Sequence, residues 1–126
     1  MKIIMMLALA GLVGLGSGIP GFSQGVAVVQ FATPFRAQTL AGFVRVGSTE
    51  VAAGGVLVEE CTGDWKVVKS STKTDEAGHF SLSDKSRKGL HYLRLSGYGF
   101  NPTLIKVIIS GSARDKELTL QIEVAT

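Results

Sequence analysis

Hydrophobic and polar residues alternate along most of this chain after its first two dozen residues. The last such segment, ELTLQIEV over residues 117–124, places its aliphatic side chains on one face and its polar side chains on the other. Strict alternation of this kind is typical of a half-buried β-strand. Six further short runs alternate or are β-branched and end at turn-forming residues; they cover residues 39–46, 55–61, 65–74, 79–83, 91–96 and 104–110.

Seven short strands separated by turn signals predict a β-sandwich or barrel. The preceding run VAVVQF, residues 26–31, ends at Thr33-Pro34. This run is either an eighth strand at a sheet edge, where proline is tolerated, or a linker. No run in residues 24–126 has the apolar spacing of a helix. We therefore expect an all-β fold, a sandwich of seven to eight antiparallel strands.

The amino terminus has the parts of a secretory signal peptide. A positive charge at Lys2 precedes an unbroken apolar run of 13 residues, 3–15, and the small-x-small triplet Gly21-Phe22-Ser23 follows. This order predicts cleavage after Ser23 and a secreted or periplasmic protein. The alternative is an uncleaved membrane anchor, but crossing the bilayer takes roughly 20 apolar residues.

The predicted organisation is a leader followed by one domain. Residues 1–23 are the signal peptide, residues 24–37 an amino-terminal segment or edge strand, and residues 38–126 the sandwich. The net charge of the chain is +3, and acidic and basic residues are interspersed apart from a local basic cluster at residues 85–88. Nucleic-acid binding needs a concentrated basic face, so we expect no nucleic-acid partner.

Cys61 is the single cysteine of the chain. Exported domains of this size often contain disulfides, but a lone cysteine forms no internal bridge. Cys61 is either a small buried hydrophobic residue or one half of an intermolecular disulfide. A catalytic thiol is disfavoured, because no neighbouring histidine or lysine in the sequence is positioned to lower its pKa.

The stretch TDEAGHFSL, residues 74–82, predicts a tight corner. Thr74 closes a strand, and the carboxylate of Asp75 can accept hydrogen bonds from backbone N–H groups two or three residues on. Gly78 supplies the positive φ that such turns favour, and Phe80 directs an aromatic ring into the core. We interpret these four residues as a structural hairpin.

The same stretch also contains three groups that bind metals or transfer protons, namely Asp75, Glu76 and His79. At a hairpin corner, Glu76 and His79 point into water in divergent directions, and no second ligand group is near in sequence. We therefore predict no metal site and no cofactor.

Several motifs spread over roughly residues 40–124 are shared with a known family. The matching positions are Gly42-Phe43-Val44, AGGVLV at residues 53–58, Thr72-Lys73-Thr74-Asp75, Gly78, Phe80, Gly89, Tyr92, Leu93, Leu95 and Gly99, with His91 as an extra residue. Together they resemble the carboxypeptidase regulatory-like domains. The resemblance implies a transthyretin-like, Greek-key sandwich of seven strands, and it implies no particular function. The family's loop proline before its second motif is absent here.

Catalytic signatures are missing where related sandwiches carry them. Transthyretin-like hydroxyisourate hydrolases use an early histidine and a terminal Tyr-Arg-Gly-Ser, whereas here the first histidine is His79 and the chain ends in EVAT. The nucleophile-elbow, zinc-protease and P-loop motifs are also absent. The Lys–Asn crosslink of collagen-adhesin B-type repeats uses a terminal strand, and the single asparagine, Asn101, lies in an earlier loop. We predict that the protein is not an enzyme.

These observations leave a small exported module that binds or packs. The first hypothesis is protein binding or assembly at the cell envelope or outside the cell, through a sheet edge or the end loops. The second is a carbohydrate- or small-ligand-binding module that uses the loop aromatics Trp65, Tyr98 and Phe100, although the same rings can instead pack the ends of the sandwich. The third is a spacer without a ligand. We place protein binding first and expect a monomer or weak dimer.

Overall fold

The computed structural model describes residues 27–83 and 87–125, so the predicted signal peptide lies outside the described residues. Within them the chain forms strands and no helix, and therefore contains no helical segment suited to crossing a membrane. The strands are β2 (Val29–Gln30), β3 (Phe35–Ala37), β4 (Ala41–Val46), β5 (Leu57–Cys61), β6 (Val68–Lys73), β7 (His79–Ser81), β8 (Gly89–Ser96), β9 (Thr103–Ile109) and β10 (Leu118–Ile122).

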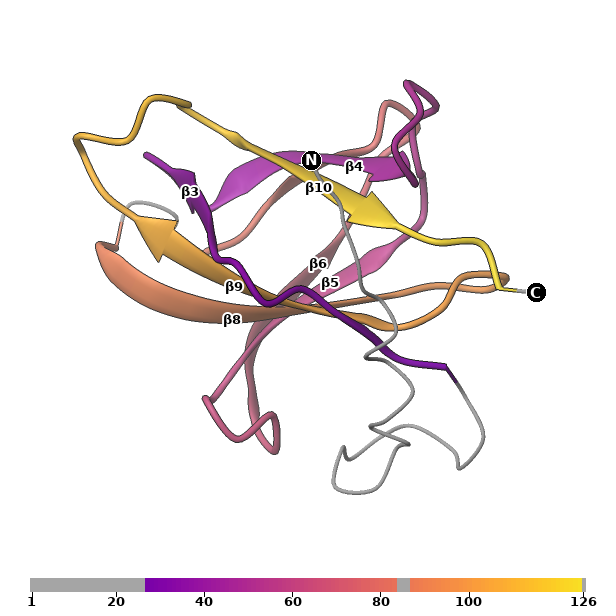
Figure 1. The fold of residues 1–126 in the computed structure, drawn as a ribbon, viewed down its shortest axis with the longest axis horizontal. Helices are drawn as coiled ribbons and strands as arrows, with labels where there is room; N and C mark the ends of the chain where they lie inside the picture. The colour runs from indigo at the N-terminus through magenta and orange to yellow at the C-terminus, as the bar shows by residue number, and fades with distance from the viewer. Residues whose placement is uncertain (1–26, 84–86, 126) are drawn as a thin grey trace.

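The strands form two sheets that pack face to face (Figure 1). The larger sheet has the order β2-β9-β8-β5-β6, with β3 also paired to β9, and the smaller sheet has the order β10-β4-β7. The prediction of an all-β sandwich is confirmed, and each of the seven segments predicted from alternation contains a strand.

Strand direction differs from the prediction, because both sheets are mixed rather than antiparallel. β10 runs parallel to β4, and β2 and β3 run parallel to β9; the other neighbouring strands are antiparallel. The described residues also contain nine strands instead of seven or eight. Parallel neighbours require a long crossover between them, and alternation within one strand does not reveal which distant strand lies alongside it.

Within residues 27–37, the chain forms an edge of the larger sheet and is not a linker. β2 pairs with the first two residues of β9, and β3 pairs with its last three. The chain leaves the sheet between them, around Thr33-Pro34. β3 was not predicted, because three residues are too few to show alternation. Two short pieces of chain therefore cover the outer edge of β9.

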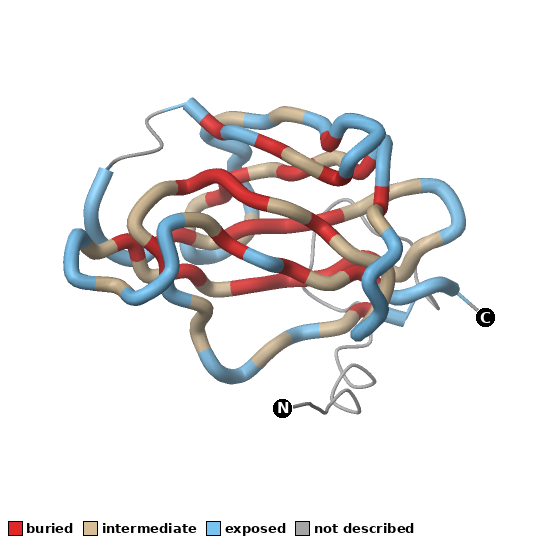
Figure 2. The backbone as a smooth tube through the Cα atoms, turned by 90° about the horizontal axis from the view of Figure 1, so that it is seen from above, coloured by how far each residue is buried: buried red, intermediate tan, exposed pale blue. Residues whose placement is uncertain are grey.

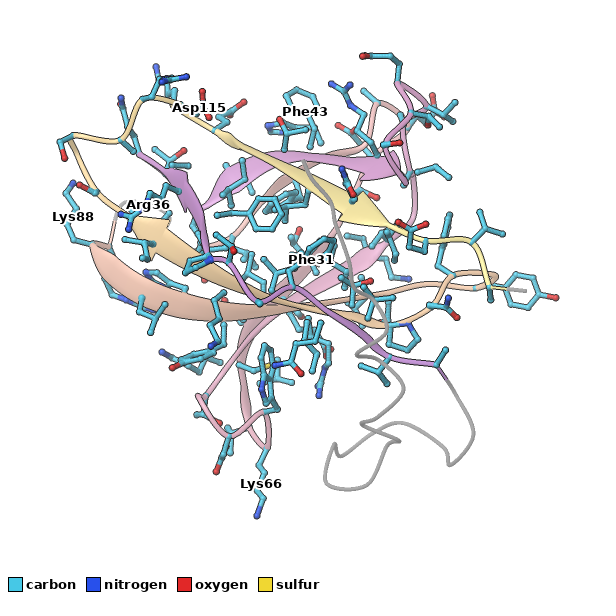
Figure 3. The ribbon with its side chains drawn as sticks, in the orientation of Figure 1. Phe31, Arg36, Phe43, Lys66, Lys88 and Asp115 are labelled. Carbon is cyan, nitrogen blue, oxygen red and sulfur yellow. The ribbon has the colours of Figure 1, made fainter. Side chains whose placement is uncertain are left out.

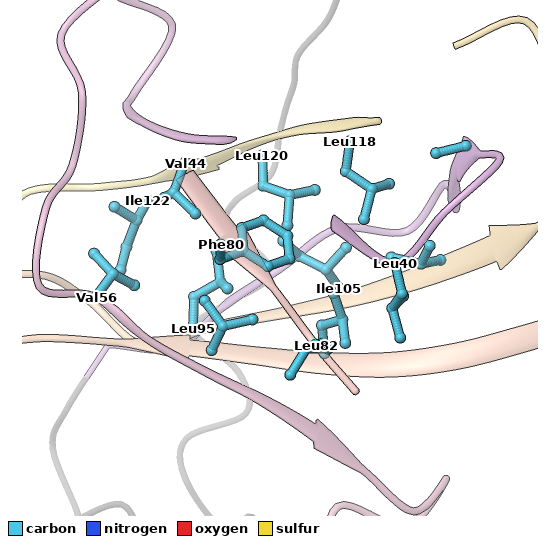
Figure 4. Packing of buried hydrophobic residues seen from close by; sticks show 14 of the residues in the cluster. Leu40, Val44, Val56, Phe80, Leu82, Leu95, Ile105, Leu118, Leu120 and Ile122 are labelled. Atoms are coloured by element: carbon cyan, nitrogen blue, oxygen red, sulfur yellow. The ribbon is translucent and has the colours of Figure 1, made fainter. Parts of the chain in front are cut away.

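The inward-facing side chains of the two sheets meet in one core, with Phe80 between the layers (Figure 4). Figure 2 shows that the buried positions follow the middle of the strands, whereas the connecting loops are mostly exposed. Complete burial of a large apolar side chain stabilises the fold by about 1.5–3 kcal/mol. Fully buried members of the core include Leu40, Val44, Val56, Leu82, Leu95, Ile105, Leu118, Leu120 and Ile122.

Gly42 permits the close approach of β4 and β10. A Cβ atom at this position would lie 2.0 Å from the backbone O atom of Leu118, which is far inside van der Waals contact. Glycine weakens a strand interior in general and often marks a site where another backbone comes close. Here it allows the parallel β4–β10 pair that closes the smaller sheet.

Candidate functional site

The predicted corner is a tight turn held by the carboxylate of Asp75. Asp75 Oδ1 accepts hydrogen bonds from the backbone N–H groups of Ala77 and His79, both at 2.9 Å. Gly78 has a φ of +80° and donates its N–H to Asp75 O at 2.9 Å. Phe80 then enters the core, where it is almost completely buried.

This corner connects the two sheets, so the prediction of a hairpin was wrong. β6 pairs with β5 in the larger sheet, whereas β7 pairs with β4 in the smaller one. Thr74, the last residue before the corner, accepts a hydrogen bond at Oγ1 from Val56 N at 2.8 Å and donates one to Ala53 O at 2.7 Å. These bonds hold the end of β6 to β5 while the chain crosses to the other layer. The structure is therefore an arch, a distinction that a local turn sequence does not encode.

A pair of ionisable groups lies on the inward face of the larger sheet. Val58 and Leu95 point into the core, and the same alternation along β5 and β8 continues to Glu60 and His91. The exposed fractions of Glu60 and His91 are 2% and 1%. Groups of this kind are rarely fully buried unless they are paired.

Glu60 and His91 belong to a compact cluster that also contains Arg87 and Lys69. His91 Nδ1 lies 2.6 Å from Glu60 Oε2, and His91 Nε2 lies 2.9 Å from the backbone O atom of Arg87. The guanidinium of Arg87 donates to the same Glu60 oxygen at 2.5 Å, and Lys69 Nζ is 3.6 Å away from it. We call Glu60, Lys69, Arg87 and His91 the buried charge cluster.

The cations of this cluster control the protonation of Glu60. Burial alone raises the pKa of Glu60, but the hydrogen bond with His91 and the charges of His91, Arg87 and Lys69 outweigh it, so the pKa lies below its ordinary value of 4.5. Glu60 is therefore ionised at neutral pH. A paired buried charge adds little net stability over a well-packed apolar pair, whereas removing one partner leaves an uncompensated charge and costs about 3–5 kcal/mol.

The buried charge cluster has the contacts of a structural element. Both ring nitrogens of His91 are engaged, and one oxygen of Glu60 is contacted by His91, Arg87 and Lys69. Ser70 lies opposite Glu60 in the β5–β6 register, and its buried Oγ has no hydrogen-bond partner in the described part of the chain. A nucleophile and its base act from within hydrogen-bond reach, and no such contact joins Ser70 to His91.

Sequence reasoning missed this cluster. In the sequence, His91 is an extra residue relative to the family motif, and Glu60 falls within a predicted strand. A signal was present, because both residues occupy positions where the alternation calls for an apolar side chain. A charged residue in the inward register of a strand predicts a partner on a neighbouring strand, and β5 and β8 are such neighbours.

Cys61 lies under a small layer of side chains on the outer face of the larger sheet. Arg94 Nε donates to Glu59 Oε1 at 2.9 Å, and the rings of Trp65 and Tyr92 pack edge to face with centroids 5.5 Å apart. Cys61 itself is 1% exposed, and burial raises the pKa of its thiol. This environment favours the reading of Cys61 as a small buried side chain, and an intermolecular disulfide would require the covering residues to move.

The three candidate ligand-binding aromatics do not form one site. Trp65 follows the end of β5 that pairs with Tyr92, whereas Tyr98 follows the end of β8 that pairs with Leu57, so they lie at opposite ends of the strands. Tyr98 is fully exposed, and Phe100 packs against the core. A sugar-binding platform needs rings that lie together, and Trp65 lies at the opposite end of the strands from Tyr98.

Asp75 and His79 of the corner are engaged in contacts other than metal binding. The Asp75 carboxylate is used by the turn, and His79 lies 3.4 Å from Glu117 and packs edge to face on Phe43. In residues 27–83 and 87–125, no group of three or more histidine, cysteine or acidic side chains is arranged to hold a metal ion.

The strand β6 forms an open edge of the larger sheet. It is the last strand of the larger sheet, and in the described residues only β5 pairs with it. The β5–β6 hairpin projects away from the smaller sheet (Figure 1). Thr74 donates its N–H to Val56 O, and backbone groups alternate in direction along an antiparallel strand, so the N–H groups of Ser71 and Lys73 point away from β5.

Comparison with known proteins adds no family assignment. No protein-family model matches this chain, and no curated protein is significantly similar to it.

Proposed function

We propose that this protein is an exported, non-catalytic β-sandwich module that binds a protein partner at the cell envelope or outside the cell by accepting an extended segment at β6. The observation that carries the proposal is the outer edge of β6, with which no strand pairs in residues 27–83 and 87–125; β6 is a six-residue strand with four exposed positions. An open edge offers a row of N–H and C=O groups to an added strand.

The other parts of the proposal rest on sequence and on the buried charge cluster. The apolar run and small-residue triplet before residue 24 support export. The motifs in residues 40–124 support a module of the carboxypeptidase regulatory-like kind. Non-catalytic function is supported by the contacts of Glu60 and His91, which are directed at each other and at Arg87.

The test replaces one residue whose backbone N–H points outward. Ser71→Pro removes that N–H and places a ring on the open edge, whereas Ser71→Ala keeps the N–H and serves as the matched control. The full chain is expressed in a secreting bacterial host. The exported protein is then immobilised and used to capture binding proteins from the secreted fraction of that host. We expect a protein that is retained by the wild type and by Ser71→Ala and lost with Ser71→Pro.

Two results would contradict the proposal. Equal capture by Ser71→Pro and Ser71→Ala would show that β6 is not the binding edge. Intact mass and cell fractionation of the expressed chain test export independently, and a product that keeps residues 1–23 and stays inside the cell would contradict that part. Binding of a polysaccharide with a change in Trp65 fluorescence would favour the carbohydrate-binding alternative.

A further inference from the structure

The open edge and the hairpin tip that leads into it carry positive charge. Residues 65–74 contain Lys66, Lys69 and Lys73 and no acidic residue. Lys66 extends from the tip of the β5–β6 hairpin, away from the sandwich (Figure 3). Lys69 is 3.6 Å from Glu60, whereas Lys66 and Lys73 have no carboxylate within ion-pair distance among the described residues. We call residues 66–73 the basic edge.

The acidic residues that flank the basic edge are engaged by other groups. Asp64 Oδ1 accepts hydrogen bonds from Thr62 Oγ1 at 2.6 Å and from Lys66 N at 3.0 Å. Asp75 Oδ1 accepts hydrogen bonds from the backbone N–H groups of the corner. Glu59, across from β6 on β5, is paired with Arg94. These carboxylates are directed into their own loops and neighbours, so the lysine side chains define the charge that an added strand would meet.

The basic edge also exposes apolar side chains, and the residue that precedes it has a strained backbone conformation. Val67 and Val68 are 57% and 41% exposed. Trp65, just before them, has a φ of +66°, a conformation that is uncommon for a bulky non-glycine residue and carries a cost of order 1–3 kcal/mol. Strain of this kind persists only where surrounding contacts over-determine it, and here the turn Thr62–Trp65 and the Trp65–Tyr92 ring contact do so.

We infer that the segment that binds at β6 is an acidic extended strand in which glutamate or aspartate alternates with small apolar or β-branched residues. This inference rests on the proposed function and names the chemistry of the partner. Cross-strand pairs of opposite charge are favourable and like charges are unfavourable. A second copy of β6 would bring lysine against lysine, so the basic edge discriminates against self-pairing and selects an acidic partner.

The experiment uses two fluorescein-labelled peptides of about ten residues. One alternates glutamate with valine and threonine, and the other has lysine in place of each glutamate. We expect the mature wild type to bind the glutamate peptide at least tenfold more tightly in about 0.05 M salt, and we expect the difference to shrink in about 0.5 M salt because exposed charges are screened. Fluorescence anisotropy measures both affinities.

Charge reversal supplies the matched comparison. In the variant Lys66→Glu/Lys73→Glu, the preference should invert in favour of the lysine peptide. Lys116→Glu, which makes a charge change on an exposed residue before β10, should keep the wild-type preference. Lys69 is left unchanged because it contacts Glu60. If the reversed variant unfolds, Lys66→Gln/Lys73→Gln tests the same point, with loss of the preference as the expected result.

The outcomes separate this inference from the proposed function. Equal binding of both peptides, lost with Ser71→Pro, would overturn the acidic partner and leave strand addition at β6 intact. Binding of the glutamate peptide that survives Ser71→Pro would overturn both. Failure of the folded wild type to bind either peptide, self-association that Ser71→Pro abolishes, or equally tight binding of a single-stranded oligonucleotide would each overturn the acidic strand as the occupant.

Discussion

The two edges of the larger sheet end in different ways. At one edge the chain covers β9 with β2 and β3, and Ala37 of β3 is completely buried. At the other edge, β6 has no further strand in the described residues and exposes four of its six positions. The open edge carries lysines and a register shift opposite Glu60 and Cys61, and both features are known to discourage indiscriminate pairing. One edge thus ends in two short strands of two and three residues that cover β9, and the other ends in the six-residue strand β6.

The largest expected effect comes from placing the same charge at each edge. Ala37→Asp buries a carboxylate beside β9 without a planned partner and should cost about 3–5 kcal/mol of unfolding free energy, or prevent folding. Ser71→Asp adds the same group at the open edge and should change the unfolding free energy by about 0.5 kcal/mol or less. Urea denaturation of both variants measures the difference, and similar losses would show that β6 is covered.

The buried charge cluster connects β6 to the core through the contact between Lys69 and Glu60. Its removal should have the next largest effect on the unfolding free energy. Glu60→Ala leaves His91 and Arg87 without their shared carboxylate and should destabilise the protein by about 3–5 kcal/mol. Lys69→Ala removes the most exposed and most distant of the three side chains that contact the Glu60 carboxylate, and it should cost about 1 kcal/mol or less. Equal losses in urea unfolding would mean that Lys69 is as important as the buried partners.

Acid should weaken the side of the sandwich that carries the cluster. The pKa of Glu60 in the folded chain is below 4.5, so the folded state binds fewer protons than the unfolded state in this range. The contribution of Glu60 is therefore fully present above about pH 4.5 and is lost as the pH falls through the folded pKa. The wild type should lose stability more steeply than Glu60→Gln between about pH 5 and pH 3, and parallel curves would exclude this role.

A small effect on stability is also expected at the outward-facing backbone of β6. Ser71→Pro removes an N–H that points away from β5 and should cost about 1 kcal/mol or less, because edge strands tolerate proline. Thr72→Pro removes an N–H that points toward β5 and should cost about 3 kcal/mol or more. If thermal unfolding ranked the two variants in the opposite order, the assigned direction of the β6 backbone would be wrong.

Much of the fold was predictable because strand alternation is a local signal. The seven predicted segments each contain a strand, and the roles of Asp75, Gly78 and Phe80 follow from turn chemistry over a few residues. The candidate binding edge was predictable only as a class, since every open sheet has edges. Which strand forms the edge depends on the pairing of strands that lie far apart in the chain. Trp65 and Tyr98 illustrate the same limit, because the β5–β8 register places them at opposite ends.

The sequence by itself determined the β-rich character, the positions of most strands and the presence of a tight corner after Thr74, because these follow from side-chain periodicity and local backbone preference. Only the tertiary structure decided that the corner is an arch and that Glu60 contacts His91. It also decided that β4 pairs in parallel with β10, where Gly42 of β4 lies against Leu118. Each of these depends on contacts between residues distant in sequence, and their free energy is set by burial and pairing in the assembled sandwich. The open edge of β6, on which the proposed function rests, is a consequence of that assembly.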